Sequence, residues 1–327
     1  MRFLPTDEQS DFARTLRSLL GAAEVPAAVR AWAAGEHGPG RSVWARLAET
    51  GLFALAAPEA YDGAGLLPLE LALGFVELGR AGVPGPVVES AAVSVLLSEL
   101  GDEALAKRFL PGLAAGETSA TLALPGGSPY VLDADAATYC FTVSAAGELH
   151  LSREVVAEPL ASLDPARRLS LPTAGELLAA GPAVTAAAEA AGRWARLLTA
   201  AQCLGTGEAL LHRTVEYAKQ RTQFGTPIGS FQAVKHRLAD TLLGLEFARP
   251  LLWAAALSLS PADVAAAKLT AGEAAYAAAM TALQLHGAVG YTEELDLSLW
   301  LRKARPLRDA WGTPSACRAE VLQPRVR

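Results

Sequence analysis

The chain has 327 residues, of which 51% are hydrophobic and 19% charged, and its formal net charge is −6. This acidic balance excludes nucleic acid as an expected partner, because phosphate groups bind to basic surfaces. No uncharged apolar run reaches the roughly 18 residues of a membrane span. Residues 1–7 hold no apolar signal core, so we expect a cytoplasmic protein with no membrane partner.

The cysteines and histidines are scattered and show no spacing typical of a metal site. Each cysteine is instead predicted to be a small buried residue. The three are Cys140, Cys203 and Cys317. We therefore expect no metal.

Residues 1–117 are predicted to form helices separated by short breaks. Thr6 is typical of a helix start, since Glu8 and Gln9 follow it and apolar residues then recur at helical spacing. Two prolines, at positions 84 and 86, should separate the last helices of this segment. The helices expected after the first one run through 43–47, over 69–78 with an end at Gly79, and over 91–100.

Between residues 118 and 175 the pattern changes to short β-rich runs separated by Gly, Asp and Pro. Strands are expected over 121–124, 138–143 and 148–151. From about 176 the chain is predicted to be helical again, with segments over 182–220, 231–258, 261–286 and 293–305. This order predicts a mainly α fold with a small β insert, divided into domains 1–117, 118–175 and 176–327.

The segment from Tyr217 to Gln232 is the most informative one. It combines a helix end, a tight Gly/Pro turn and a new helix that starts near Ser230. Arg221 offers a rigid fork of donors that suits a pair of phosphate oxygens, and Gln223 adds a neutral donor. Phe224 offers a flat apolar face. The plainer interpretation is a solvated turn that Ser230 caps.

The string Arg221-x-x-Phe224-Gly225-x-x-Ile228-x-x-x-Gln232 resembles the flavin-binding turn of the acyl-CoA dehydrogenase family. Other segments resemble that family in the same order, and the resemblance extends over almost the whole chain. These segments are residues 44–52, 58–65, 77–80 and 284–293. The resemblance implies a fold with an N-terminal helical domain, a β-sheet domain and a C-terminal four-helix bundle. It also implies FAD as cofactor, an acyl-CoA or other acyl thioester as substrate, and a dimer or tetramer.

In that family the turn and the 284–293 loop reach the FAD of a neighbouring subunit. Carried over to this sequence, the cofactor-binding residues are Arg221, Gln223, Phe224, Gln232, Gln284, Gly287 and Thr313. The family oxidises the Cα–Cβ bond of an acyl-CoA. A carboxylate removes the α-proton, and the β-hydride passes to the flavin.

The family's usual base is the glutamate of a Glu-Gly-Thr string, and here Trp311 stands in its place before Gly312. Tryptophan cannot accept a proton, so Trp311 is interpreted as a core or pocket-filling residue. Some members carry the base on the helix before the flavin turn, where this chain has Ala195. Glu189 and Glu208 bracket Ala195 but share no helix face with it, so they are expected to be structural or exposed.

Asp309 is the nearest carboxylate to Trp311 and is a weak candidate for a relocated base. The competing interpretation is an ion pair with Arg305 or Arg308. Arg302, Lys303 and Arg305 could meet the phosphates of CoA, or they could form an exposed charge cluster at a helix end.

The predicted sheet domain is short, and residues 122–129 retain only part of the family's flavin-cradling pattern. Ser315 also replaces a glutamine that commonly contacts the flavin. The retained residues serve a neighbour's cofactor, whereas the degraded ones would serve the chain's own. We therefore expect a partner subunit of the kind found in actinobacterial heteromeric acyl-CoA dehydrogenases. An active dehydrogenase with a relocated base, or a member repurposed for another reaction on an acyl thioester, remains an alternative.

Overall fold

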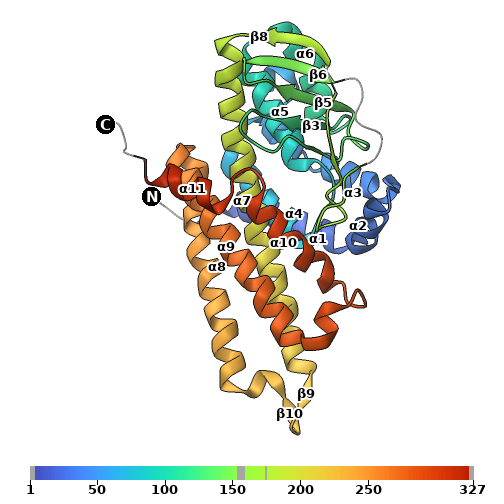
Figure 1. Cartoon of the computed structure of the whole chain (residues 1–327), viewed down its shortest axis with the longest axis vertical. Helices are drawn as coiled ribbons and strands as arrows, with labels where there is room; N and C mark the ends of the chain where they lie inside the picture. The colour runs from blue at the N-terminus through green and yellow to red at the C-terminus, as the bar shows by residue number, and fades with distance from the viewer. Residues whose placement is uncertain (1–3, 153–158, 174, 324–327) are drawn as a thin grey trace.

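The structure is a computed structural model that describes residues 4–152, 159–173 and 175–323. The N-terminal helices and a small sheet occupy one end of an elongated molecule, and the long C-terminal helices run to the other end (Figure 1). This arrangement confirms the predicted helical fold with a β insert. Within the described ranges, no helix combines the length and apolar character that crossing a membrane requires.

The first helix begins where the sequence predicts. Thr6 caps it by a capping box, in which the Thr6 hydroxyl accepts from the Gln9 amide at 3.2 Å and the Gln9 side chain accepts from the Thr6 amide at 2.9 Å. The N-terminal helices are α1 (Asp7–Gly21), α2 (Val25–Ala33), α3 (Gly38–Glu49), α4 (Pro68–Ala81), α5 (Val87–Leu100) and α6 (Glu103–Ala114). A short pair, β1 (Ala56–Ala57) and β2 (Gly65–Leu66), interrupts them.

Helix α4 does not end at Gly79 as expected, but at Ala81, with Gly82 as its left-handed cap at φ 77°. Gly79 lies inside the helix because α4 crosses α7 there at very short range. A Cβ on Gly79 would lie 2.2 Å from the Gln202 carbonyl oxygen, and one on Gly205 would lie 1.8 Å from that of Val76. The glycine pair therefore fixes how the N-terminal domain sits on the bundle.

Four strands form the main sheet in the order β3 (Ala120–Ala123), β5 (Tyr139–Val143), β6 (Glu148–Ser152) and β8 (Gly175–Ala180). The β3–β5 pair is parallel and the other pairs are antiparallel. A separate antiparallel pair joins β4 (Val131–Leu132) to β7 (Leu169–Ser170). The expected strands over 121–124, 138–143 and 148–151 correspond to β3, β5 and β6. The helical character expected from about 176 is wrong for residues 176–180, because they belong to β8 and pair with β6.

The C-terminal bundle consists of α7 (Pro182–Gln220), α8 (Gln232–Ser258), α9 (Pro261–His286), α10 (Leu297–Asp309) and α11 (Pro314–Val321). Its first three helices match the predicted segments, and α9 packs against all the others. The last predicted helix was placed over 293–305, but α10 begins four residues later and continues to Asp309. Helix α11, which Thr313 caps, was not expected.

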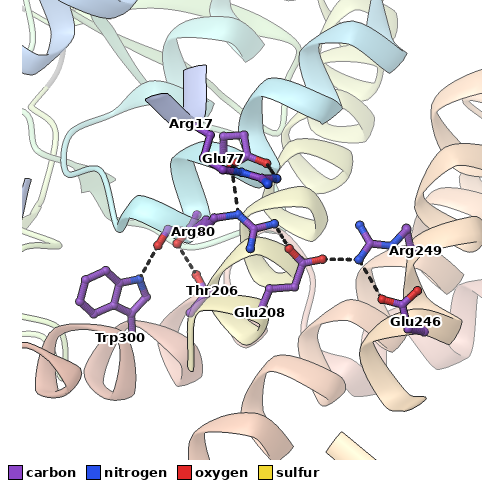
Figure 2. Close-up of polar contacts among 9 residues, drawn as sticks. Arg17, Glu77, Arg80, Thr206, Glu208, Glu246, Arg249 and Trp300 are labelled. Atoms are coloured by element: carbon purple, nitrogen blue, oxygen red, sulfur yellow. Dashed lines mark hydrogen bonds and ion pairs between the residues drawn. The ribbon is translucent and has the colours of Figure 1, made fainter. Parts of the chain in front are cut away.

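An alternating chain of charges ties α1, α4, α7 and α8 together (Figure 2). Buried Glu77 accepts from Arg17 at 2.7 Å and from Arg80 at 3.0 Å. Glu208 continues the chain by pairing with Arg80 and, at 2.6 Å, with Arg249. The segment 77–80, which resembles the family signature, thus contributes two charged residues that connect α4 to α1 and α7.

Candidate functional site

The predicted cofactor turn is a tight β-hairpin at the far end of the bundle (Figure 1). Strands β9 (Thr222–Gln223) and β10 (Thr226–Pro227) pair antiparallel across Phe224 and Gly225, whose φ angles are 56° and 79°. Two successive positive φ angles define a two-residue turn of the I′ type. The Arg221 carbonyl accepts from the Ile228 amide at 2.8 Å and closes the base of the hairpin.

Phe224 occupies the tip of this hairpin with 93% of its surface exposed. A bulky residue in the left-handed region is strained, and such strain concentrates at sites of binding. Within this chain the ring has an edge contact with Phe231, at 6.3 Å between centroids. The Phe224 ring therefore has most of its surface free of contacts with the described residues.

Arg221 and Gln232 flank the same hairpin and are both exposed. Arg221 makes no ion pair with any residue that the structure describes, so its guanidinium is available to an anion. Gln223 makes a local hydrogen bond, since its side-chain amide nitrogen donates to the Thr222 carbonyl at 2.9 Å.

The second predicted cofactor segment lies beside the end of α7. The His286 ring stacks on Tyr217 with 4.1 Å between centroids, and its Nδ1 lies 2.8 Å from the Ala282 carbonyl oxygen. Burial lowers the pKa of His286, which favours a neutral ring. Gly287 follows with φ 61° and open space around it. The stack brings Gln284 and Gly287 to the same end of the bundle as the hairpin.

Thr313 lies elsewhere, at the start of α11, and is not part of that group. Its hydroxyl accepts from the Ala316 amide at 3.3 Å and bonds the Ser315 hydroxyl at 3.1 Å. The cap therefore occupies the hydroxyl that the resemblance assigns to a cofactor contact.

Trp311, at the position where the resemblance expects the family's base, is held by contacts inside the chain. Its indole nitrogen donates to Glu89 Oε1 at 3.0 Å, and the ring packs against the main hydrophobic core. Sequence reasoning missed Glu89, which lies on α5 with 3% of its surface exposed. Burial raises the pKa of this carboxyl. The available signal was a single acidic residue inside the apolar run of residues 87–97.

Lys268, also missed, holds the loop that carries Trp311. Its ammonium is buried and donates to the carbonyl oxygens of Arg308 at 2.6 Å and Gly312 at 3.1 Å. Burial lowers the pKa of Lys268. Arg196 Nε donates to the Trp311 carbonyl at 2.9 Å. The loop is therefore fixed from both α7 and α9.

A small polar cavity of about 20 Å³ lies beside Glu89 and is also lined by Asp133, Arg167, Gln202 and Lys303. Burial raises the pKa of Asp133 to about 7. A space of this size holds about one water molecule. It cannot accommodate an acyl chain in the present conformation.

The other carboxylates near the predicted base positions are engaged in structural contacts or exposed. Asp309 ends α10 and pairs with Arg308 at 3.1 Å, as the competing interpretation predicted. Ala195 is fully buried, Glu189 is exposed, and Glu208 belongs to the charge chain of Figure 2. The expectation of structural or exposed glutamates is confirmed.

Two of the three basic residues considered for CoA phosphates already have partners. Lys303 is buried and pairs with buried Asp164 at 3.0 Å, which removes it as a phosphate contact. Arg302 pairs with Glu293, whereas Arg305 is exposed. The cysteines Cys140, Cys203 and Cys317 are all buried, as predicted.

The arrangement of helices and the sequence motifs define a class of protein. The chain matches the family described as "Acyl-CoA dehydrogenase, N-terminal domain" over residues 6–117. It matches "Acyl-CoA dehydrogenase, C-terminal domain" over residues 184–321. The chain therefore belongs to the acyl-CoA dehydrogenase family of flavoproteins, as the motifs predicted.

Particular members of the family are similar along nearly the whole chain. Acyl-CoA dehydrogenase IpdE2 of Mycobacterium tuberculosis is 38% identical over 304 residues, which cover 92% of each protein. The IpdE2 of Mycolicibacterium smegmatis is 32% identical and covers 94% of this chain and 96% of its own length. A chain of the ChsE4–ChsE5 complex from Mycobacterium tuberculosis superposes with a TM-score of 0.86 at 26% identity, covering 98% of both chains.

Proposed function

We propose that this chain is a partner subunit that lends its cofactor turn to the FAD of a neighbouring, homologous acyl-CoA dehydrogenase subunit. That neighbour oxidises the Cα–Cβ bond of an acyl-CoA thioester. One contrast carries the proposal. The hairpin of residues 221–227 is exposed and strained at Phe224, whereas Trp311 stands where the resemblance places the family's base and donates to the buried Glu89 carboxyl.

The residues of the hairpin fit the group they would hold. Arg221 can give two parallel donors to a phosphate oxygen pair of FAD. Phe224 offers a ring face to an adenosine, and Gln232 and Gln284 add neutral donors near the same end of the bundle. FAD, when bound, supplies the acceptor for the hydride that leaves the acyl-CoA.

An exposed apolar face on α8 supports association with another subunit. Leu243, Phe247 and Leu251 follow one another at four-residue spacing and are 53%, 69% and 40% exposed. Leu257 on α8 and Met280 on α9 are exposed as well. Clustered apolar surface of this kind marks an interaction site. The ChsE4–ChsE5 assembly, which is a complex of two chains, supports a homologous partner.

Co-expression tests this function directly. The chain is purified alone and together with a homologous chain from the same source that retains the Glu-Gly-Thr string. We expect little flavin absorbance in the chain alone and a stable, FAD-loaded complex with the partner. A yellow, FAD-saturated homo-oligomer with dehydrogenase activity would refute the proposal. The cytoplasmic location expected from the sequence is part of the same proposal.

Arg221→Ala should weaken FAD retention in that complex by about 10- to 100-fold, because a charge-assisted hydrogen-bond pair is lost. The measurement is FAD release on dilution, followed by flavin fluorescence. Arg14→Ala is the matched control, since Arg14 is exposed on α1 and pairs with Asp11. Equal FAD retention in the two variants would remove Arg221 from the cofactor site.

The alternative of an active dehydrogenase with a relocated base is tested by Asp309→Asn, with acyl-CoA oxidation measured in the purified chain and in its complex with the partner. Loss of acyl-CoA oxidation by this variant would favour that alternative over the partner role. The Asp309 carboxylate forms an ion pair with Arg308, which is a structural role. We therefore expect the substitution to leave turnover of the complex unchanged.

A further inference from the structure

Trp311 is held in place along its whole length. Its backbone is in the left-handed region at φ 55°, and its carbonyl accepts from Arg196 Nε. The buried Lys268 ammonium donates to the carbonyls of Arg308, three residues before Trp311, and of Gly312, the residue after it. A tryptophan at positive φ is unfavourable by itself, so these contacts impose the conformation.

The far end of the indole meets Glu89. One carboxyl oxygen accepts from the indole nitrogen at 3.0 Å, and the other accepts no hydrogen bond from the residues that the structure describes. Three other charged groups, Arg167, Asp133 and Lys303, line the same small cavity, and Lys303 is already paired with Asp164. A buried carboxyl has a strong reason to retain its single donor, because an unpaired buried polar group is costly.

We propose that Trp311 is a plug that keeps an acyl group out of this chain's own half-site, and that Glu89 is the positioning residue that anchors it. This inference rests on the proposed function, since it explains why the partner subunit handles no acyl thioester itself. Glu89 does not serve as a base in this arrangement. One oxygen is covered by the indole, and the other faces a cavity with room for about one water.

Trp311→Gly removes the plug at a position where glycine suits the backbone, because φ there is 55°. The probe is butanoyl-CoA in equilibrium dialysis, with the full chain in whichever form it purifies, alone or with its partner. We expect the number of bound butanoyl-CoA molecules to rise by one per copy of this chain. Indole should compete for the added site.

Trp44→Ala is the control for opening space elsewhere. Trp44 is also partly buried, and its indole nitrogen donates to the Gly116 carbonyl at 2.8 Å. This variant should show no added site. If Trp311→Gly does not fold, Trp311→Leu opens part of the same space and is measured in its place. Unchanged stoichiometry in a folded Trp311 variant, or wild-type binding at the same site, overturns the plug.

The anchoring role of Glu89 is tested with two bicyclic aromatic ligands, one with an N–H hydrogen-bond donor and one without. In the Trp311→Gly variant, indole should bind about 10-fold more tightly than benzothiophene, which has the same shape but no N–H. The preference should persist when Glu89→Gln is added, because the amide still accepts, and should vanish with Glu89→Leu. Equal affinities with Glu89 intact would overturn the anchoring role. These measurements need no FAD, so they fail or succeed independently of the partner role.

Discussion

Asp133 is a residue whose charge depends on the fold. It is buried at φ 51°, with one oxygen accepting from the Arg168 amide at 3.1 Å and the other without a donor among the described residues. Burial raises the pKa of this carboxyl from 3.8 to about 7. The folded chain therefore binds its proton more tightly than the unfolded chain does.

This difference makes stability depend on pH with a defined sign. Between about pH 4 and pH 7 the folded state holds more protons, so the free energy of unfolding should fall as the pH rises, by up to about 1.4 kcal/mol per pH unit. Asp133→Asn should flatten that slope, since asparagine accepts the same bond and tolerates a positive φ. Glu89 acts in the same direction and leaves a residual slope. Denaturant unfolding at several pH values measures this slope for the wild type and for Asp133→Asn. Equal slopes in the two proteins would contradict the role of Asp133.

At the scale of elements, the crossing of α4 over α7 decides how the N-terminal helices sit on the bundle. The contact works because Gly79 and Gly205 let two backbones approach, with the Arg80 and Glu208 charges closing the same junction (Figure 2). The segment 77–80 could be identified from the sequence as a family signature. Its structural role could not, because Gly205 and its neighbours lie more than 100 positions away.

Gly205→Ala should disrupt this crossing, since its Cβ would lie 1.8 Å from the Val76 carbonyl oxygen. We expect a loss of about 3 kcal/mol in the free energy of unfolding from overpacking. Gly244→Ala is the matched control within α8, because its nearest neighbour would be the Ala274 Cβ at 3.8 Å. That variant should be neutral or more stable by up to about 1 kcal/mol. Similar losses in urea unfolding of both variants would show that the crossing is not tight.

At the scale of the whole molecule, the C-terminal bundle carries the exposed surfaces that the proposed function assigns to contacts with other chains. The hairpin with Phe224 and the apolar face of α8 leave large hydrophobic groups in water, which a monomer would not be expected to retain. An assembly would explain both proposed features, the plug at Trp311 and the exposed cofactor turn. Under the proposed function, the partner chain would supply the base and the residues that hold the flavin ring.

Phe247→Asp should therefore weaken the assembly with the partner subunit, because it puts a charge at the centre of the α8 face. We expect the dissociation constant to rise by at least about 30-fold, as for a buried interface anchor. Leu177→Asp on β8 is the control, since Leu177 is comparably exposed at 55% but lies on the sheet. Analytical ultracentrifugation of both variants with the partner measures the effect. Equal assembly would exclude the α8 face as the interface.

Several features of this protein can be predicted from its sequence because they depend on interactions between residues close together in the chain. The Thr6 cap, the Phe224–Gly225 turn and the three long helices from Pro182 follow from short-range patterns that need no distant contact. The family motifs are also continuous stretches of chain. By itself, therefore, the sequence determined the helical frame, the family and the position of the turn between α7 and α8.

Only the tertiary structure decided the features that join distant segments. The run Gly175–Ala180 is rich in good helix formers, yet it forms strand β8 because β6 offers it an open edge to pair with. Glu89 and Trp311 lie 222 positions apart, and their hydrogen bond joins α5 to the loop that follows α10. Lys303, which could have met a phosphate, is instead buried against Asp164. Each outcome depends on burial and on partners that the folded chain alone brings together.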